Sequence, residues 1–194
     1  MDEELGVPTE EHYRKAKEGN WSFEFNLLNK HLDGDDELQV IVRGHLYLEH
    51  VLIQFLNQAL PLPEAIDLRR VPYSMKIDLC VALRLIRPSL VPPMNKVNEL
   101  RNRVAHNLHY VFTEKDKLDF YNCYPKFGQT LVSERGQIGK TFPLSEIGYG
   151  HMIKVLVVLL DADRLGYIEW KKKRDAAIEN ARKVLNEVVD RKED

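Results

Sequence analysis

Three side chains that can do chemistry on a phosphate occur within residues 101–106, which read RNRVAH. Arg101 supplies a permanent cation whose planar fork matches phosphate oxygens, and His106 can give or take a proton near neutral pH. Asn102 has an amide that can orient either group. These residue types at this spacing predict phosphoryl chemistry, with Arg101, Asn102 and His106 as the candidate catalytic residues.

The motif is expected at the end of a helix over residues 93–106, because Pro92 and Pro93 suit a helix entry and no breaker follows them before residue 108. At about 100° per residue, one sector of this helix collects Val97, Leu100, Val104 and Leu108. The opposite side collects Asn98, Asn102, His106 and His109. Arg101 lies at the border, so the motif is predicted to face solvent, a ligand or a partner chain.

The segment over residues 98–107 resembles the R-N-x-x-x-H signature of the HEPN superfamily, to which Arg101, Asn102 and His106 correspond. These all-α proteins include metal-independent ribonucleases of toxin and defence systems. The resemblance implies cleavage of RNA by attack of a 2′-hydroxyl on the neighbouring phosphate, without a cofactor or a metal. His106 would then transfer protons, Arg101 would stabilise phosphoryl charge, and Asn102 would orient His106.

The resemblance also implies partners. HEPN ribonucleases pair their motif helices across a two-fold axis, so we expect a homodimer with a composite cleft that takes RNA, and an antitoxin or regulatory protein as a further partner. One HEPN toxin subgroup carries a tyrosine two residues after the histidine, as a target of nucleotidylation. That position is Leu108 here, so the resemblance does not extend to that subgroup.

A second interpretation is a noncatalytic helical module. Residues 76–86, followed by Leu100-Arg101-Asn102, resemble the mannitol operon repressor-like branch of helical regulators. In such a transcriptional regulator or interaction subunit, the same polar residues would form an interface network without turnover. A formal net charge of −2 and a pI near 6.4 argue against a strong nonspecific binder of nucleic acid, since any RNA contact must come from a local patch.

The hydrophobic pattern predicts an all-α, up-and-down bundle, because no segment alternates as a strand does. The predicted helices cover residues 10–18, 22–32, 36–59, 74–86, 93–106, 113–123, 151–165 and 168–189, with a loop at 126–142. Gly166 is expected to separate or kink the last two helices, and Gly44 to mark a close approach of another helix. The predicted domain organisation is an N-terminal extension at 1–34, a HEPN-like bundle at 35–166 and a charged C-terminal helix at 167–194.

Other signals favour structural roles. The loop sequence GQIGKT at 136–141 lacks the first glycine and the leading strand of a phosphate-binding loop. The basic run at 171–174 beside Trp170 is interspersed with acids and is typical of a solvated helix face. His106 and His109 have no Cys or carboxylate at ligand spacing, so no metal site is predicted.

The compartment is predicted from the cysteines and the N-terminus. Cys80 and Cys123 are expected to be reduced thiols, and the acidic N-terminus has no apolar signal region. The most apolar stretch, residues 153–160, is too short to span a bilayer. The sequence therefore predicts a cytoplasmic protein with no membrane partner.

Overall fold

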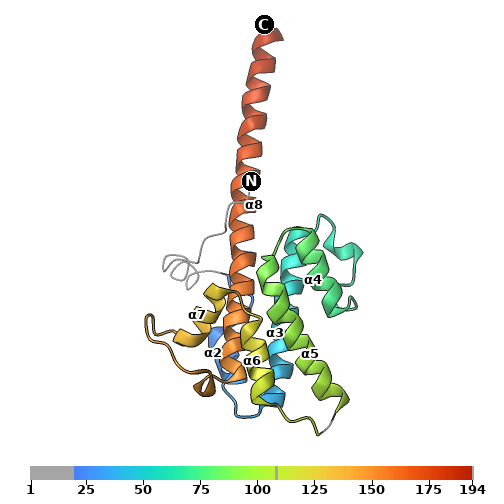
Figure 1. Cartoon of the computed structure of the whole chain (residues 1–194). Helices are drawn as coiled ribbons and strands as arrows, with labels where there is room; N and C mark the ends of the chain where they lie inside the picture. Colours follow the sequence, from blue (N-terminus) through green and yellow to red (C-terminus); the bar gives the residue numbers. More distant parts are fainter. Residues whose placement is uncertain (1–19, 108, 194) are drawn as a thin grey trace.

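The computed structural model describes residues 20–107 and 109–193, with side chains up to residue 186. Within these ranges the chain forms helices joined by turns, with no strand, which confirms the all-α prediction (Figure 1). The predicted first helix at 10–18 lies outside the described residues. Among the described helices, none combines the length and the apolar character that crossing a bilayer requires.

Helix α3, Glu37–Ala59, is the central element of the bundle. It begins as the sequence predicts, because the Asp36 carboxylate caps it by accepting from the backbone N–H groups of Leu38 and Gln39 at 3.0 and 3.2 Å. Its fully buried apolar face follows the 3-4 spacing of an amphipathic helix. That face consists of Val40, Ile41, Leu48, Val51, Leu52, Phe55 and Leu56.

Helix α8, Tyr149–Glu193, packs along α3 and then continues beyond the rest of the molecule (Figure 1). The predicted contact at Gly44 is confirmed, since a Cβ there would lie 2.5 Å from Cγ2 of Ile153 in α8. The predicted break at Gly166 is wrong, because α8 runs through it without interruption. A helical glycine costs only about 1 kcal/mol, and Tyr167 packs against Phe55 of α3, which holds this turn in place.

Helix α2, Phe25–Leu32, packs its buried Leu28 and Leu32 against α3 and α8. The α2 carbonyl end lies so close to the start of α8 that a Cβ on Gly150 would overlap the Leu32 carbonyl oxygen. Only glycine fits at this crossing. The start of α8 is thus in tight contact with the end of α2.

Helix α4, Tyr73–Ala82, ends earlier than the predicted residue 86. Arg84 adopts a left-handed φ of 54°, and the backbone N–H groups of Arg84 and Leu85 return to the carbonyls of Val81 and Cys80. This is the Schellman termination, which satisfies the last carbonyls of the helix. The helix also begins one residue before the predicted residue 74, with Pro72 at the N-cap position.

Short 3-10 turns, η1 Pro63–Ala65 and η2 Pro88–Leu90, flank α4, and η2 leads directly into helix α5, Val91–His106. Helix α5 begins two residues before the predicted start, with both prolines in its first turn, where their missing N–H groups cost nothing. Its end at His106 is as predicted.

Helix α6, Glu114–Asn122, lies within the predicted range 113–123 and begins with a complete capping box formed by Thr113 and Asp116. Helix α7, Lys126–Glu134, overturns the prediction of a loop at 126–142. Its apolar side chains Phe127, Leu131 and Val132 pack onto the core, and tertiary burial stabilises a segment whose sequence reads as broken. The remaining loop, with η3 Leu144–Glu146, returns the chain to α8.

Candidate functional site

The motif lies at the C-terminal end of α5. Val97 and Leu100 are fully buried in the core, as predicted, whereas Val104 is half-buried and Leu108 lies outside the described residues. Arg101 and His106 are exposed, and Asn102 is half-buried. The apolar side of α5 thus anchors the helix, while Arg101 and His106 stay accessible at its end.

Within the motif, the Nη1 group of Arg101 donates a hydrogen bond to the Asn102 Oδ1 oxygen at 3.1 Å. The asparagine that was expected to orient His106 therefore orients the guanidinium instead. His106 is in the last turn of α5. A cation and a proton-transfer group are available at one helix end.

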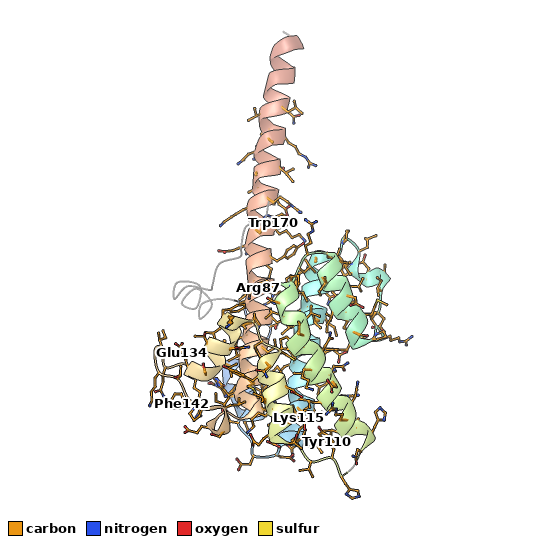
Figure 2. All side chains as sticks on the ribbon, viewed as in Figure 1. Arg87, Tyr110, Lys115, Glu134, Phe142 and Trp170 are labelled. Carbon is orange, nitrogen blue, oxygen red and sulfur yellow. The ribbon has the colours of Figure 1, made fainter. Side chains whose placement is uncertain are left out.

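Arg103 has a different role from Arg101, although the two lie in the same segment of sequence. Its guanidinium pairs with Glu99 on the preceding turn of α5, reaches Asp116 of α6 at 2.9 Å and donates to the Tyr110 hydroxyl at 3.2 Å. Asp116 also belongs to the α6 capping box. Arg103 therefore joins the end of α5 to the start of α6, near Tyr110 at the lower end of the molecule in Figure 2.

A polar cluster that the sequence does not reveal lies beside the motif, between α3 and α5. The buried imidazole of His45 is hydrogen-bonded through Nε2 to the Asn98 Oδ1 oxygen at 3.2 Å. Asn98 therefore turns toward α3, although the helical spacing predicted that it faces away from the core with Asn102. Burial lowers the pKa of His45. The charge of Glu49 and the hydrogen bond that His45 donates to Asn98 oppose this effect, and the charge of Arg101 lowers the pKa further.

The cluster continues from α3 into α4. The fully buried Lys76 Nζ donates to the Glu49 Oε1 oxygen at 2.5 Å and to the Val71 carbonyl at 2.8 Å. The Tyr73 ring lies against the His45 ring, with 4.3 Å between the centroids. The only sequence signal for this cluster is that a histidine and a lysine occur at apolar helix positions, and such signals identify burial rather than a role.

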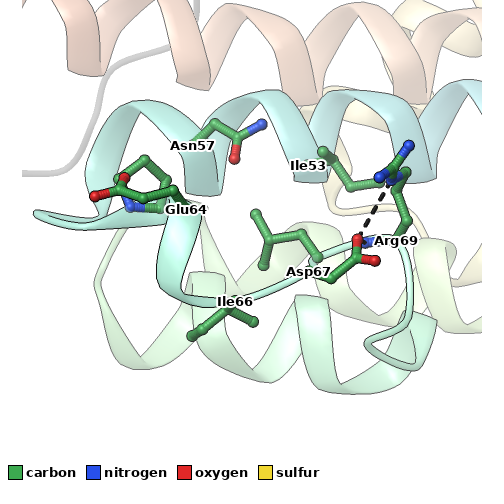
Figure 3. Close-up of a pocket in the computed structure, with 8 residues that line it drawn as sticks. Ile53, Asn57, Glu64, Ile66, Asp67 and Arg69 are labelled. Atoms are coloured by element: carbon green, nitrogen blue, oxygen red, sulfur yellow. Dashed lines mark hydrogen bonds and ion pairs between the residues drawn. The ribbon is translucent and has the colours of Figure 1, made fainter.

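A surface hollow of about 610 Å³ lies away from the motif, between α3 and the turn that follows η1 (Figure 3). Its lining residues are Ile53, Asn57, Pro63, Glu64, Ile66, Asp67, Leu68 and Arg69. Arg69 and Asp67 in its wall pair with each other at 3.3 Å, so neither is poised for a ligand. The hollow is not part of the candidate site.

The other sequence signals have structural partners. Lys171 donates to the Gln58 carbonyl at 2.7 Å and so satisfies the end of α3, while Arg174 lies over the Trp170 ring. In the loop at 136–141, the Gly139 N–H donates to the carboxylate of Glu134, which leaves that amide unavailable to a phosphate. Within the part of the chain that the structure describes, no three His, Cys, Asp or Glu side chains converge as metal ligands do.

At the end of α5, Arg101 therefore offers an exposed cation that Asn102 holds, and His106 offers an exposed imidazole. The polar cluster around His45 lies behind Arg101 and is electrostatically coupled to its guanidinium.

No protein-family model matches the chain, and neither a curated protein nor a solved structure is significantly similar to it.

Proposed function

We propose that the protein is a metal-independent endoribonuclease of the HEPN type, related to toxin or defence systems. The observation that carries the proposal is that Arg101 and His106 are both exposed at the end of α5, while Val97 and Leu100 on the apolar side of the same helix are fully buried. A rigid helix end that presents a cation and a titratable imidazole is suited to positioning a phosphodiester.

In this reaction a base removes the proton of an RNA 2′-hydroxyl, and the resulting oxygen attacks the adjacent phosphorus. The bond from phosphorus to the 5′-oxygen breaks, and that oxygen takes up a proton. The products are a 2′,3′-cyclic phosphate and a 5′-hydroxyl. His106 serves the proton transfers, and Arg101 stabilises the charge on the phosphoryl oxygens.

The two groups require a second chain. Arg101 and His106 differ by about 140° around the helix axis, so one copy of α5 does not direct both at the same phosphate. A homodimer that pairs two α5 ends about a two-fold axis would bring Arg101 of one chain to His106 of the other. Asn102 supports this arrangement by holding the guanidinium.

The test is cleavage of single-stranded RNA in excess EDTA, with the ends of the products identified. Wild-type protein is expected to leave 2′,3′-cyclic phosphates. His106→Ala is expected to slow cleavage by about 10²–10⁴, and Arg101→Ala to do nearly as much. His109→Ala and Arg70→Ala are the matched controls, because both remove an exposed side chain of the same type outside the motif.

A mixture of Arg101→Ala and His106→Ala chains tests the composite cleft. Heterodimers would contain one site with both groups intact, so the mixture is expected to recover part of the activity that each variant lacks. Absence of cleavage by the wild type on several RNAs, or equal rates in wild type and His106→Ala, would overturn the proposal. Equal rates would identify a contaminating nuclease.

A noncatalytic interaction or regulatory module, like the mannitol operon repressor-like proteins, is the second candidate. The observation that favours it is the part of α8 beyond residue 171, whose apolar side chains are exposed instead of packed on the bundle. A protein built to hold partners would use such a surface. Stable binding of a partner protein by a chain that cleaves no RNA would favour this function.

A further inference from the structure

The last part of α8 extends from the bundle without support from the other residues that the structure describes. Lys171 makes its contact with Gln58, and from residue 172 to residue 186 every described side chain is exposed. Figure 1 shows this extension pointing away from the end of the molecule at which α5 stops, and Trp170 in Figure 2 marks its base. At 1.5 Å per residue, the helix from residue 172 to residue 193 is about 30 Å long.

This extension has an apolar stripe. Ile178, Val184 and Leu185 are 45%, 60% and 63% exposed, and all three lie within an arc of about 120° that also holds Ala177 and Ala181. Helices of this length are marginally stable alone in water, and most of their stability comes from packing an apolar face. The stripe is therefore expected to be covered.

The charges beside the stripe identify what covers it. Asp175 and Arg182 lie seven residues apart on the same border of the stripe, next to Ile178. In heptad terms, Ile178 and Leu185 occupy a positions, Ala181 a d position, and the two charges e positions. In an antiparallel pair of helices, e positions face e positions of the partner.

We propose that the α8 extension pairs with the same segment of a second copy of this chain, antiparallel, about a two-fold axis between residues 179 and 180. In this register Ile178 of each chain packs on Ala181 of the other. Asp175 of each chain then meets Arg182 of the other, so the pair is joined by two identical opposite-charge contacts. On the other border, Ala177 meets Val184, which extends the apolar contact.

A parallel pair does not use these charges. Each e position then faces a g position of the partner helix. Asp175 would face the partner copy of Trp170, and Arg182 would face the partner copy of Ala177. The charge pattern is thus complementary only in the antiparallel arrangement. This pairing leaves both α5 ends free, so it is independent of the proposed nuclease site.

The test measures assembly mass by sedimentation over a range of concentrations, with circular dichroism to establish that each variant is folded. Asp175→Arg and Arg182→Asp each place two like-charge pairs across the interface and should weaken association by about tenfold or more. An equimolar mixture of these two variants restores both contacts in the heterodimer, and so does the double variant in its homodimer. Both should therefore associate as the wild type does.

Lys183→Glu is the matched control, because Lys183 lies on the outer face of the extension and pairs only loosely, at 3.8 Å, with Glu179. Its association should equal that of the wild type. If the chains also pair through α5, each single reversal should halve the mass of the assembly rather than produce a monomer. A wild type that stays monomeric, or a mixture that associates no better than the single variants, would overturn the proposal.

Discussion

His45 of α3 and Asn98 of α5 are joined side chain to side chain at 3.2 Å, directly behind the exposed Arg101. This contact places a buried, titratable imidazole at the junction of the central helix and the motif helix. Burial and the neighbouring Arg101 keep its pKa below 6.5, against the effect of Glu49 and of the hydrogen bond that it donates to Asn98. The folded protein therefore favours neutral His45.

The first prediction is a loss of stability in mild acid. Because the folded state lowers the pKa of His45, the unfolded chain takes up a proton first as pH falls below 6.5, and the free energy of unfolding decreases. His45→Gln should make this dependence shallower. Urea denaturation at several pH values measures it.

His151 contributes a residual slope in that variant, since burial lowers its pKa as well. The control is His109→Gln, which changes an exposed histidine and should leave the wild-type slope intact. A His45→Gln protein with an unchanged slope would show that protonation of His45 is not linked to unfolding.

The second prediction separates the two arginines of the motif. Arg103→Ala removes the contacts with Glu99, Asp116 and Tyr110 and should lower the free energy of unfolding by about 1 kcal/mol. Arg101→Ala removes an exposed side chain that donates a hydrogen bond to its neighbour Asn102, and it should change stability by less than about 0.5 kcal/mol. Thermal unfolding of both variants, with RNA cleavage measured alongside, distinguishes structural from chemical roles.

The sequence predicted those features that depend on residues close to one another in the chain. The 3-4 spacing of α3, the capping box at Thr113 and the buried stripe at Val97 and Leu100 are each properties of a few neighbouring residues. The contact at Gly44 was predictable because a glycine in a long amphipathic helix has a helix-propensity cost that a close packing partner explains.

Tertiary contacts determined what the sequence did not reveal. Helix α7 forms because its apolar side chains pack on the core, although its glycine and polar residues weaken the helical pattern in its sequence. The turn at Gly166 stays helical because Tyr167 meets Phe55 of α3. The partners of Arg103 and His45 are 13 and 53 residues distant in sequence, so no motif could have assigned their roles.

The third prediction concerns two glycines in helices. Gly44→Ala would place a Cβ 2.5 Å from the buried Ile153 and should lower the free energy of unfolding by about 1–3 kcal/mol, despite the better helix propensity of alanine. Gly166→Ala meets no atom within 4 Å and should raise stability by about 0.5–1 kcal/mol. Chemical denaturation of both variants gives opposite signs if α3 and α8 cross as described.

The fourth prediction concerns the buried ion pair of α8. Asp161 and Arg164 are almost completely buried and paired with each other, and Asp161 also accepts from the N–H and the hydroxyl of Ser22 at 2.9 and 3.0 Å. Arg164 donates to the Asn20 carbonyl at 2.5 Å. The pair thus fixes the start of the described chain to α8.

Asp161→Asn keeps the volume of the side chain but leaves the Arg164 charge buried without its counter-ion. Removing one partner of a buried pair commonly costs about 3–5 kcal/mol, so the midpoint of thermal unfolding should fall steeply. Asp67→Asn is the matched control, because Asp67 pairs with the exposed Arg69 and Arg70 and such pairs contribute about 0–1 kcal/mol. Equal losses in the two variants would mean that the Asp161 carboxylate is solvated, and that residues 20–22 are held to α8 by other contacts.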